Sequence, residues 1–427
     1  MKVGRMVALA LLWGTLPALA QAPSPAPVPA PAVTNLCVDC HLAVDDPKIS
    51  PPARAFADDL HARAGLTCAS CHGGDPSQSD QEKAHDRSKG FLGRPSPAAV
   101  PALCGKCHAD AALMKRFNPS LRVDQVSEYW TSEHGKKLRT GDQNVAECAS
   151  CHGAHGIVHV KDLRSPVSSG KIAQTCNTCH GDAAKMGPYH IPADVYAKYK
   201  RSVHFQAREK GDASAPTCNS CHGNHGAAPP EVGSVANVCG TCHATFAEKF
   251  KSSPHAEAFL SMGLPACVTC HENHEIVKPT EAFLGSGKES RCASCHEPDS
   301  VGGKAAAEMQ RDLGGLVRET DQARETIRRA AEAGMEVSKI RFELLQADEA
   351  LTKARAEVHL FRSSAVRAAT GSGLAVARSA RRGADKALRE RDYRQRGLFL
   401  SLALIVVSIL ALLAKIRERS RSAPPPP

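Results

Sequence analysis

All 18 cysteines of this 427-residue chain fall in nine copies of the pattern Cys-x-x-Cys-His. This pattern is the attachment signature of c-type haem. Two thiols add to the vinyl groups of one porphyrin, and the adjacent His binds the iron as proximal ligand. Zinc sites need no His after each cysteine pair, and a disulfide scaffold has no reason to repeat one spacing nine times. The sequence therefore predicts nine covalently bound haems c.

The predicted attachment residues are Cys37, Cys40, Cys68, Cys71, Cys104, Cys107, Cys148, Cys151, Cys176, Cys179, Cys218, Cys221, Cys239, Cys242, Cys267, Cys270, Cys292 and Cys295. The predicted proximal ligands are His41, His72, His108, His152, His180, His222, His243, His271 and His296.

Nine haems in so short a segment constrain the fold. The segment from Cys37 to His296 has only 260 residues, and aromatic residues make up 4% of the chain. So little chain cannot wrap each porphyrin in its own protein core, so the porphyrins themselves must form the core. We expect a mainly α fold with large loop content, in which a haem-packed domain precedes long helices.

A repeated frame places an aromatic residue five positions, and a small or capping residue two positions, before a His. Its His residues are His61, His134, His204 and His255, and each precedes a haem motif. Another motif follows in each unit, so residues 35–300 read as a half unit plus four two-haem units. A further His stands three residues after the proximal His in three units, at His155, His225 and His274, whereas the first unit has Asp75 there.

These additional histidines are candidates for the second axial ligand. A His three residues past the proximal ligand cannot easily reach the far face of the same iron, but it can ligate a neighbouring haem. The predicted distal set is His61, His85, His134, His155, His190, His204, His225, His255 and His274. For His159 and His190, ligation and ordinary packing are equally good interpretations, and His359 is expected to be solvated.

Residues 37–296, with their nine motifs and the extensions CHGAHG and CHGNHG, resemble the multihaem c-type cytochromes of bacterial respiration. The resemblance implies bis-His haems of low potential that pass electrons one at a time in the periplasm. The same broad group includes reductases of nitrite and tetrathionate and hydroxylamine oxidoreductase. An enzyme of that type, with one open haem, is the alternative, and no catalytic residue is predicted.

The two ends of the chain predict export and anchoring. Residues 1–20 have the charged start, short apolar core and Ala-Leu-Ala site of a signal peptide, and residues 21–34 form a Pro/Ala-rich linker. Residues 398–414 are uncharged and long enough for one transmembrane helix, before a short basic and Pro-rich tail at 415–427. Counting basic residues alone would put the part of the chain before this helix in the cytoplasm. Haem attachment, which takes place outside the cytoplasm, places this part in the periplasm instead.

Residues 304–396 contain no Pro and carry apolar residues at alternating steps of three and four. This pattern predicts either a helical hairpin packed on itself and the haem domain, or a coiled coil with a partner or a second copy. The register of the apolar pattern changes near Gly334, and Gly371-Ser372-Gly373 is a predicted break in the helix.

The formal charge of +10 resides in residues 362–427, which hold 14 basic and 4 acidic residues. Its position favours anionic lipid over nucleic acid. Together these features predict an inner-membrane-anchored electron carrier with its haems in the periplasm. Its expected donor is a quinol or quinol-oxidising membrane complex or dehydrogenase, and its acceptor a periplasmic or outer-membrane cytochrome or a terminal reductase.

Overall fold

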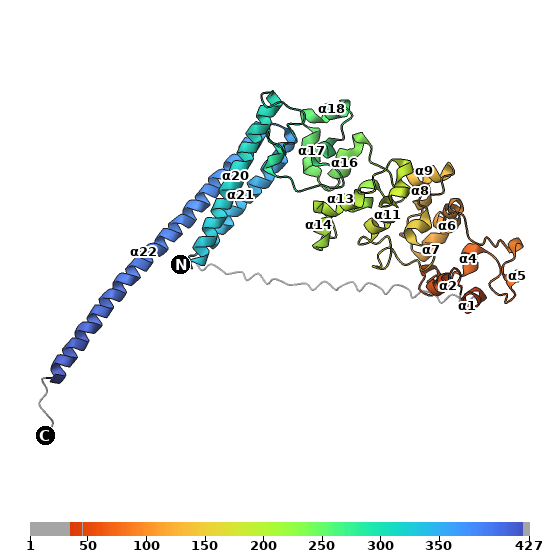
Figure 1. The fold of residues 1–427 in the computed structure, drawn as a ribbon, viewed down its shortest axis with the longest axis horizontal. Coiled ribbons are helices and arrows are strands. Elements are labelled where there is room, and N and C mark those ends of the chain that lie inside the picture. The colour runs from red at the N-terminus through yellow and green to blue at the C-terminus, as the bar shows by residue number, and fades with distance from the viewer. Residues whose placement is uncertain (1–34, 45, 422–427) are drawn as a thin grey trace, which may run out of the picture.

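The computed structural model describes residues 35–44 and 46–421, and the predicted signal peptide and linker lie outside this part of the chain. The structure is 65% helical, and the described residues form helices, turns and loops without a strand. The predicted mainly α fold is therefore confirmed. Figure 1 shows two parts: a domain of short helices and a bundle of long ones. We call them the motif domain (residues 35–300) and the bundle (residues 301–396).

Most of the C-x-x-C-H motifs lie on short helices. Those helices are α1 (Leu36–Ala43), α4 (Cys68–His72), α6 (Val100–His108), α10 (Cys148–His152), α11 (Ile172–His180), α15 (Cys218–His222) and α19 (Ala266–His271), whereas α16 (Val235–Gly240) carries only the first Cys of its motif. Smaller connecting helices are α5 (Gln81–Ala84), α7 (Ala111–Phe117), α12 (Ala183–Met186) and the 3₁₀ turns η1 (Arg87–Lys89), η2 (Pro97–Ala99), η3 (Gly187–Tyr189), η4 (Val232–Ser234) and η5 (Glu281–Phe283).

The repeated frame forms a pair of helices that meet at its small residue. The pairs are α2 (Ser50–Phe56) with α3 (Leu60–Arg63), α8 (Gln125–Thr131) with α9 (Glu133–Arg139), α13 (Val195–Arg201) with α14 (Val203–Glu209), and α17 (Ala244–Lys251) with α18 (Pro254–Ser261). Ser132 is the N-cap of α9, where its hydroxyl accepts a hydrogen bond from the Gly135 amide at 2.9 Å. The aromatic residue also has a role, because the Tyr129 hydroxyl donates to the Ala146 carbonyl just before the next motif.

The bundle consists of α20 (Val301–Glu332), α21 (Ser338–Glu357) and α22 (Ser363–Arg421). A turn at Gly334, whose φ is 77°, joins the first two helices, and η6 (Val358–Leu360) joins the last two. The apolar seam is buried within the chain, for example at Leu316, Leu344 and Val366. This packing corresponds to the interpretation in which the region folds on itself and on the motif domain.

The predicted break at Gly371-Ser372-Gly373 is wrong, because α22 runs through it without interruption. A Cβ atom at Gly373 would lie only 2.7 Å from the Cβ of Ala350 and 3.0 Å from Leu316. The glycine therefore serves close packing of three helices rather than a turn. Tertiary packing outweighs the low helix propensity of glycine here.

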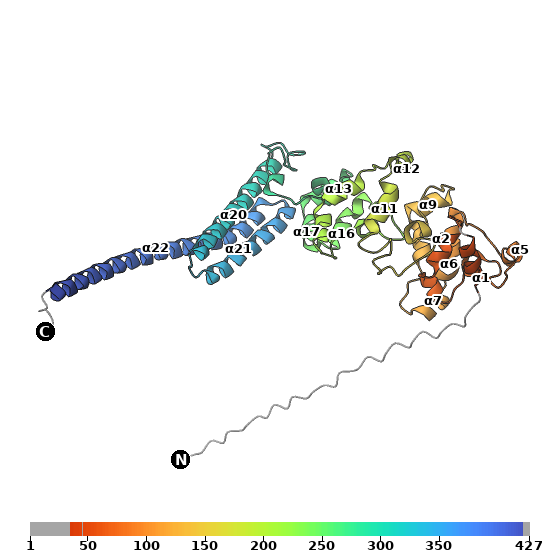
Figure 2. The same cartoon turned by 60° about the horizontal axis from the view of Figure 1, so that its bottom comes forward.

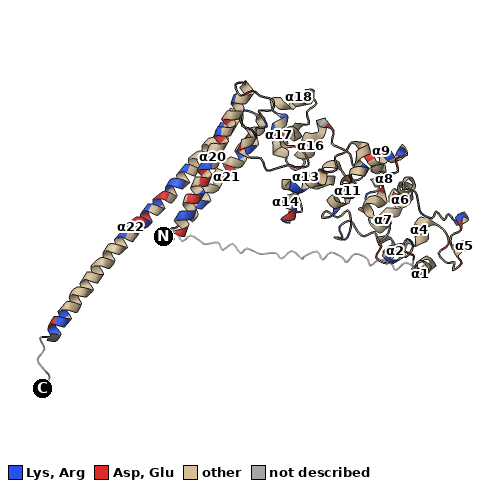
Figure 3. Cartoon of the chain, in the orientation of Figure 1, with Lys and Arg blue, Asp and Glu red and all other residues tan. Residues whose placement is uncertain are grey.

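Helix α22 continues well beyond the bundle (Figures 1 and 2). It contains an 18-residue window of mean hydropathy 2.8, none of it buried, so it is long and apolar enough to cross a membrane. The exposed run at residues 398–414 lies between basic residues, which Figure 3 shows in blue. This arrangement is what the sequence predicted for a membrane span.

Candidate haem sites

Each of the nine proximal histidines faces one other imidazole, with ring centroids 5.8–6.2 Å apart. Metal–imidazole bonds of about 2.0 Å, plus about 1.1 Å from nitrogen to ring centre on each side, would separate the centroids by about 6 Å. The residues therefore fit a haem iron between the two rings of each pair. Numbered 1 to 9 in chain order of the motifs, the pairs are His41–His85, His72–His155, His108–His61, His152–His225, His180–His134, His222–His274, His243–His204, His271–His359 and His296–His255.

Hydrogen bonds at Nδ1 support this arrangement, because a ligating imidazole normally donates its other N–H to a fixed acceptor. Nδ1 of His72 lies 2.8 Å from the Gly93 carbonyl. Nδ1 of His61 lies 3.0 Å from a carboxylate oxygen of Asp59, whose side chain is 5% exposed. In both rings Nε2 is left for the iron.

Burial also holds most of these rings in the neutral form that binds metal. It lowers the pKa of twelve imidazoles, so they stay unprotonated at neutral pH. These are His41, His108, His134, His152, His155, His180, His204, His225, His255, His271, His274 and His359.

The nine sites follow one another in space in the order of the chain. The thiol of Cys176, for example, lowers the pKa of Cys218 at the next site to about 7 through a hydrogen bond. These thiols stand in for the thioether sulfurs of attached haems, so the porphyrins held there would be neighbours. The neighbouring thiols are Cys37–Cys68, Cys71–Cys104, Cys104–Cys148, Cys151–Cys179, Cys176–Cys218, Cys221–Cys239, Cys239–Cys267 and Cys270–Cys292. The result is one unbranched row.

The pairs divide into two geometric classes. At sites 2, 4, 6 and 8 the two rings are stacked, with interplanar angles of 8–14°. At the other five sites the planes make angles of 31–86°. In the stacked class the second ring always comes from a later part of the chain. At sites 2, 4 and 6 it belongs to the His three residues after the proximal His of the site two further along, and at site 8 it belongs to the bundle. Each even site therefore ties its unit to the next segment.

Backbone hydrogen bonds reinforce these ties between units. In three units, the second helix of the frame pair begins with an amide that donates to a carbonyl of the next unit. That carbonyl belongs to the residue two positions after the distal His of the next unit. These bonds join Leu60 to Ile157 at 2.7 Å, Glu133 to Ala227 at 3.1 Å and Val203 to Ile276 at 2.8 Å. The same tripeptide, His-x-apolar, thus supplies both a ring and a carbonyl to the preceding unit.

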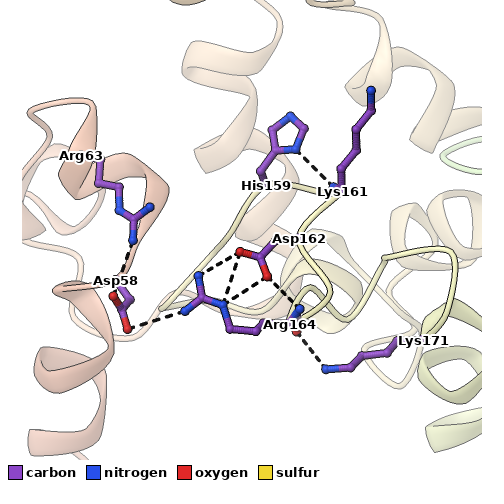
Figure 4. A network of polar contacts seen from close by, with 7 residues as sticks. All are labelled: Asp58, Arg63, His159, Lys161, Asp162, Arg164 and Lys171. Atoms are coloured by element: carbon purple, nitrogen blue, oxygen red, sulfur yellow. Dashed lines mark hydrogen bonds and ion pairs between the residues drawn. The ribbon is translucent and has the colours of Figure 1, made fainter. Parts of the chain in front are cut away.

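Charged side chains add to the first of these junctions (Figure 4). Arg164 pairs with Asp162 at 2.9 Å and reaches Asp58 of the first unit at 3.8 Å. His159 lies in the same loop, where its Nδ1 accepts a hydrogen bond from the Lys161 amide at 3.2 Å. Its side chain is exposed, so it takes part in a turn and not in one of the imidazole pairs.

Eight of the nine predicted distal histidines face a proximal His, and His190 does not. His190 is exposed and ends η3 with a φ of 55°, outside the ring pairs of the described residues. The ninth place is taken by His359, whose expected solvation is wrong: its ring is partly buried against Phe246 and His271. The sequence signal that was missed is the tripeptide His359-Leu360-Phe361, which repeats the His-x-apolar pattern of the earlier units.

Comparison with protein families gives an independent indication. Residues 60–181 match the family model of cytochrome c3, and this segment contains the motifs beginning at Cys68, Cys104, Cys148 and Cys176. Searches of the curated proteins and of the solved structures found no match. The family match supports a multihaem c-type cytochrome that binds haem c covalently and transfers electrons.

Proposed function

We propose that this chain is a membrane-anchored cytochrome with nine bis-His haems that conducts electrons along a single row. The observation that carries the proposal is the set of nine imidazole pairs with a spacing that suits an intervening iron. In this role the bound haems supply the redox chemistry. The chain holds each iron from both sides and keeps neighbouring porphyrins close.

The same pairs favour an electron carrier over a multihaem reductase. Catalysis at a haem needs one iron with a free coordination position, whereas each proximal His here faces a second imidazole. Because both axial positions would be filled, substrates such as nitrite or hydroxylamine would have no iron to bind.

The length of α22 favours a protein donor over a quinol that reacts directly. From Ser363, where α22 leaves the motif domain, to Leu398, where the apolar run begins, the helix rises about 50 Å at ~1.5 Å per residue. Both views draw the motif domain extending sideways from the end of the bundle remote from the apolar run (Figures 1 and 2). Electrons do not tunnel over such a distance in one step. The donor is then a quinol-oxidising complex or dehydrogenase whose redox centres project from the inner membrane into the periplasm.

Spin-state spectroscopy of the purified full-length protein tests the electron-carrier proposal. We expect nine haems per chain by pyridine haemochrome assay and only low-spin ferric signals by electron paramagnetic resonance. A stoichiometric high-spin signal that shifts on addition of cyanide or nitrite would instead establish an open haem.

A liposome assay tests the donor proposal. Quinol confined to the bilayer should leave the haems oxidised, and a soluble one-electron donor should then reduce them. Rapid reduction by the quinol alone would refute the need for a protein donor.

A further inference from the structure

The turn between α21 and α22 reaches from the bundle into the motif domain. It is formed by η6, and it ends at Phe361, which has a φ of 52°. His359 in this turn faces His271 with a ring-centroid distance of 6.1 Å and an interplanar angle of 14°. Its Nδ1 lies 3.2 Å from the Arg355 carbonyl, so Nε2 remains for a metal. The ring therefore has the stacked geometry and Nδ1 contact found for ligands within the motif domain.

The turn also reproduces the tie that joins successive haem units. In the earlier units a distal His and the residue two positions on contact the preceding unit together, as His155 and Ile157 do. His359 and Phe361 have the same spacing, and Phe361 packs on His255 with ring centroids 3.9 Å apart. The last frame differs in one respect, because Pro254 stands where the other frames have a donating amide. Ring packing by Phe361 thus takes the place of the backbone hydrogen bond.

An ion pair beside the turn holds it against the motif domain. Lys249 and Glu357 lie 3.0 Å apart, and their side chains are only 24% and 14% exposed. Phe246 covers the outer edge of His359 at a centroid distance of 5.0 Å. The turn is therefore fixed by contacts on both sides of the His, as a preorganised ligand requires.

We propose that His359 is the distal ligand of the haem attached at Cys267 and Cys270, and that the bundle caps the haem row by imitating the start of a further haem unit. This inference rests on the proposed bis-His electron carrier. It makes the bundle part of the electron-transfer domain, because site 8 is complete only when the turn is docked. It also gives the bundle the role that terminal caps have in repeat proteins, where they close the last unstacked unit.

The test replaces His359 by Gly in the full-length protein, with His190→Ala as matched control. In the variant we expect one of the nine ferric haems to become high-spin and to bind cyanide, with all nine still attached. Added imidazole should restore the low-spin spectrum, which would distinguish ligation from packing. His190→Ala should keep the wild-type spectrum, because this exposed His faces no proximal ring.

Two results would separate the failure of this inference from failure of the proposed function. A His359→Gly protein that binds nine haems and remains entirely low-spin would refute His359 as a ligand while leaving the electron carrier intact. A wild-type protein that already contains a high-spin haem would instead overturn the bis-His proposal itself. Glu357→Gln is a second probe, which does not depend on how the Gly variant folds. Weaker docking of the turn should give a partial high-spin signal that imidazole removes. An unchanged spectrum at raised temperature would count against docking through the turn.

Discussion

Asp59 should set the potential of the haem at site 3. Its carboxylate lies 3.0 Å from Nδ1 of His61, the second ring of that site, and also accepts hydrogen bonds from the amides of His61 and Ile157. The corresponding residues in the other frames are serines. A buried carboxylate behind an axial imidazole stabilises the ferric state, which carries one more positive charge than the ferrous state. Removing the charge by Asp59→Asn should therefore raise this potential most.

The size of the shift follows from the geometry. With the iron on Nε2, the carboxylate charge would lie about 7 Å from the metal, and at an effective dielectric constant of about 20 this gives ~2.4 kcal/mol. For a one-electron couple, 59 mV corresponds to a tenfold change in the equilibrium constant, so this energy corresponds to about 100 mV. Because the His61 side chain is 32% exposed, solvent screening reduces the expected shift to about 50–100 mV.

A spectroelectrochemical titration of the whole protein measures this shift. The component of site 3 should move upward most, and that of site 2 should move less, because the Asp59 charge also acts on His155 and Cys71 of that site. The other seven should keep their potentials. Asp58→Asn is the matched control, because the neighbouring carboxylate is 69% exposed and should have little effect. The reasoning would be refuted if no component moved, or if both variants produced the same change.

Further predictions concern stability and spectra. Ser132→Ala should destabilise the motif domain by about 1 kcal/mol, because the amide of Gly135 loses its hydrogen-bond acceptor. Thermal melting followed by circular dichroism would detect this loss, and an unchanged melting midpoint would count against the cap. Leu316→Ala, at a fully buried position of the bundle, should cost about 2–5 kcal/mol in urea unfolding. Gly373→Val should also unfold the bundle more easily, since the added methyls meet Ala350, and an equally stable variant would contradict the close packing. Ferric electron paramagnetic resonance should show rhombic low-spin signals from the four sites with stacked rings, and large-gmax signals from the most steeply tilted pairs.

The local chemistry of the sites was predictable from the sequence, whereas part of the long-range pairing was not. The spacing within C-x-x-C-H predicts each attachment site and its proximal His. The repeated frame identified His61 and its equivalents because a repeated pattern implies a repeated structure. The pairing of His359 with His271 was not predicted, because His359 lies 88 residues after His271, in a segment whose composition indicates an amphipathic helix. Only tertiary packing brings these two residues together.

The bundle was misread for the same kind of reason. The apolar pattern of residues 304–396 gave no sign of a turn near Phe361, and Gly371-Ser372-Gly373 suggested a break. In the structure the chain instead turns at Phe361 and continues straight through the glycines. A turn that docks on another domain needs few local signals, since its conformation is held by Phe361 against His255 and by Glu357 against Lys249. Local propensity is a weak guide where tertiary contacts of this kind decide.

The ties between units all run from an earlier site to a later segment, and this direction explains why the row needs a cap at one end only. Even sites take their second ring from a later segment, so a row that simply stopped after site 9 would leave site 8 open. At the other end site 1 obtains its second ring from His85, inside the following unit, and no earlier segment is required. Asp75 can therefore replace the post-motif His of the first unit, where it binds Lys89 at 2.6 Å instead of facing another haem site. One residue in the cap would thus separate two functions for such a scaffold. With His359, every iron of the proposed row would have both axial ligands, whereas without it the iron at site 8 would have an open position able to bind substrate.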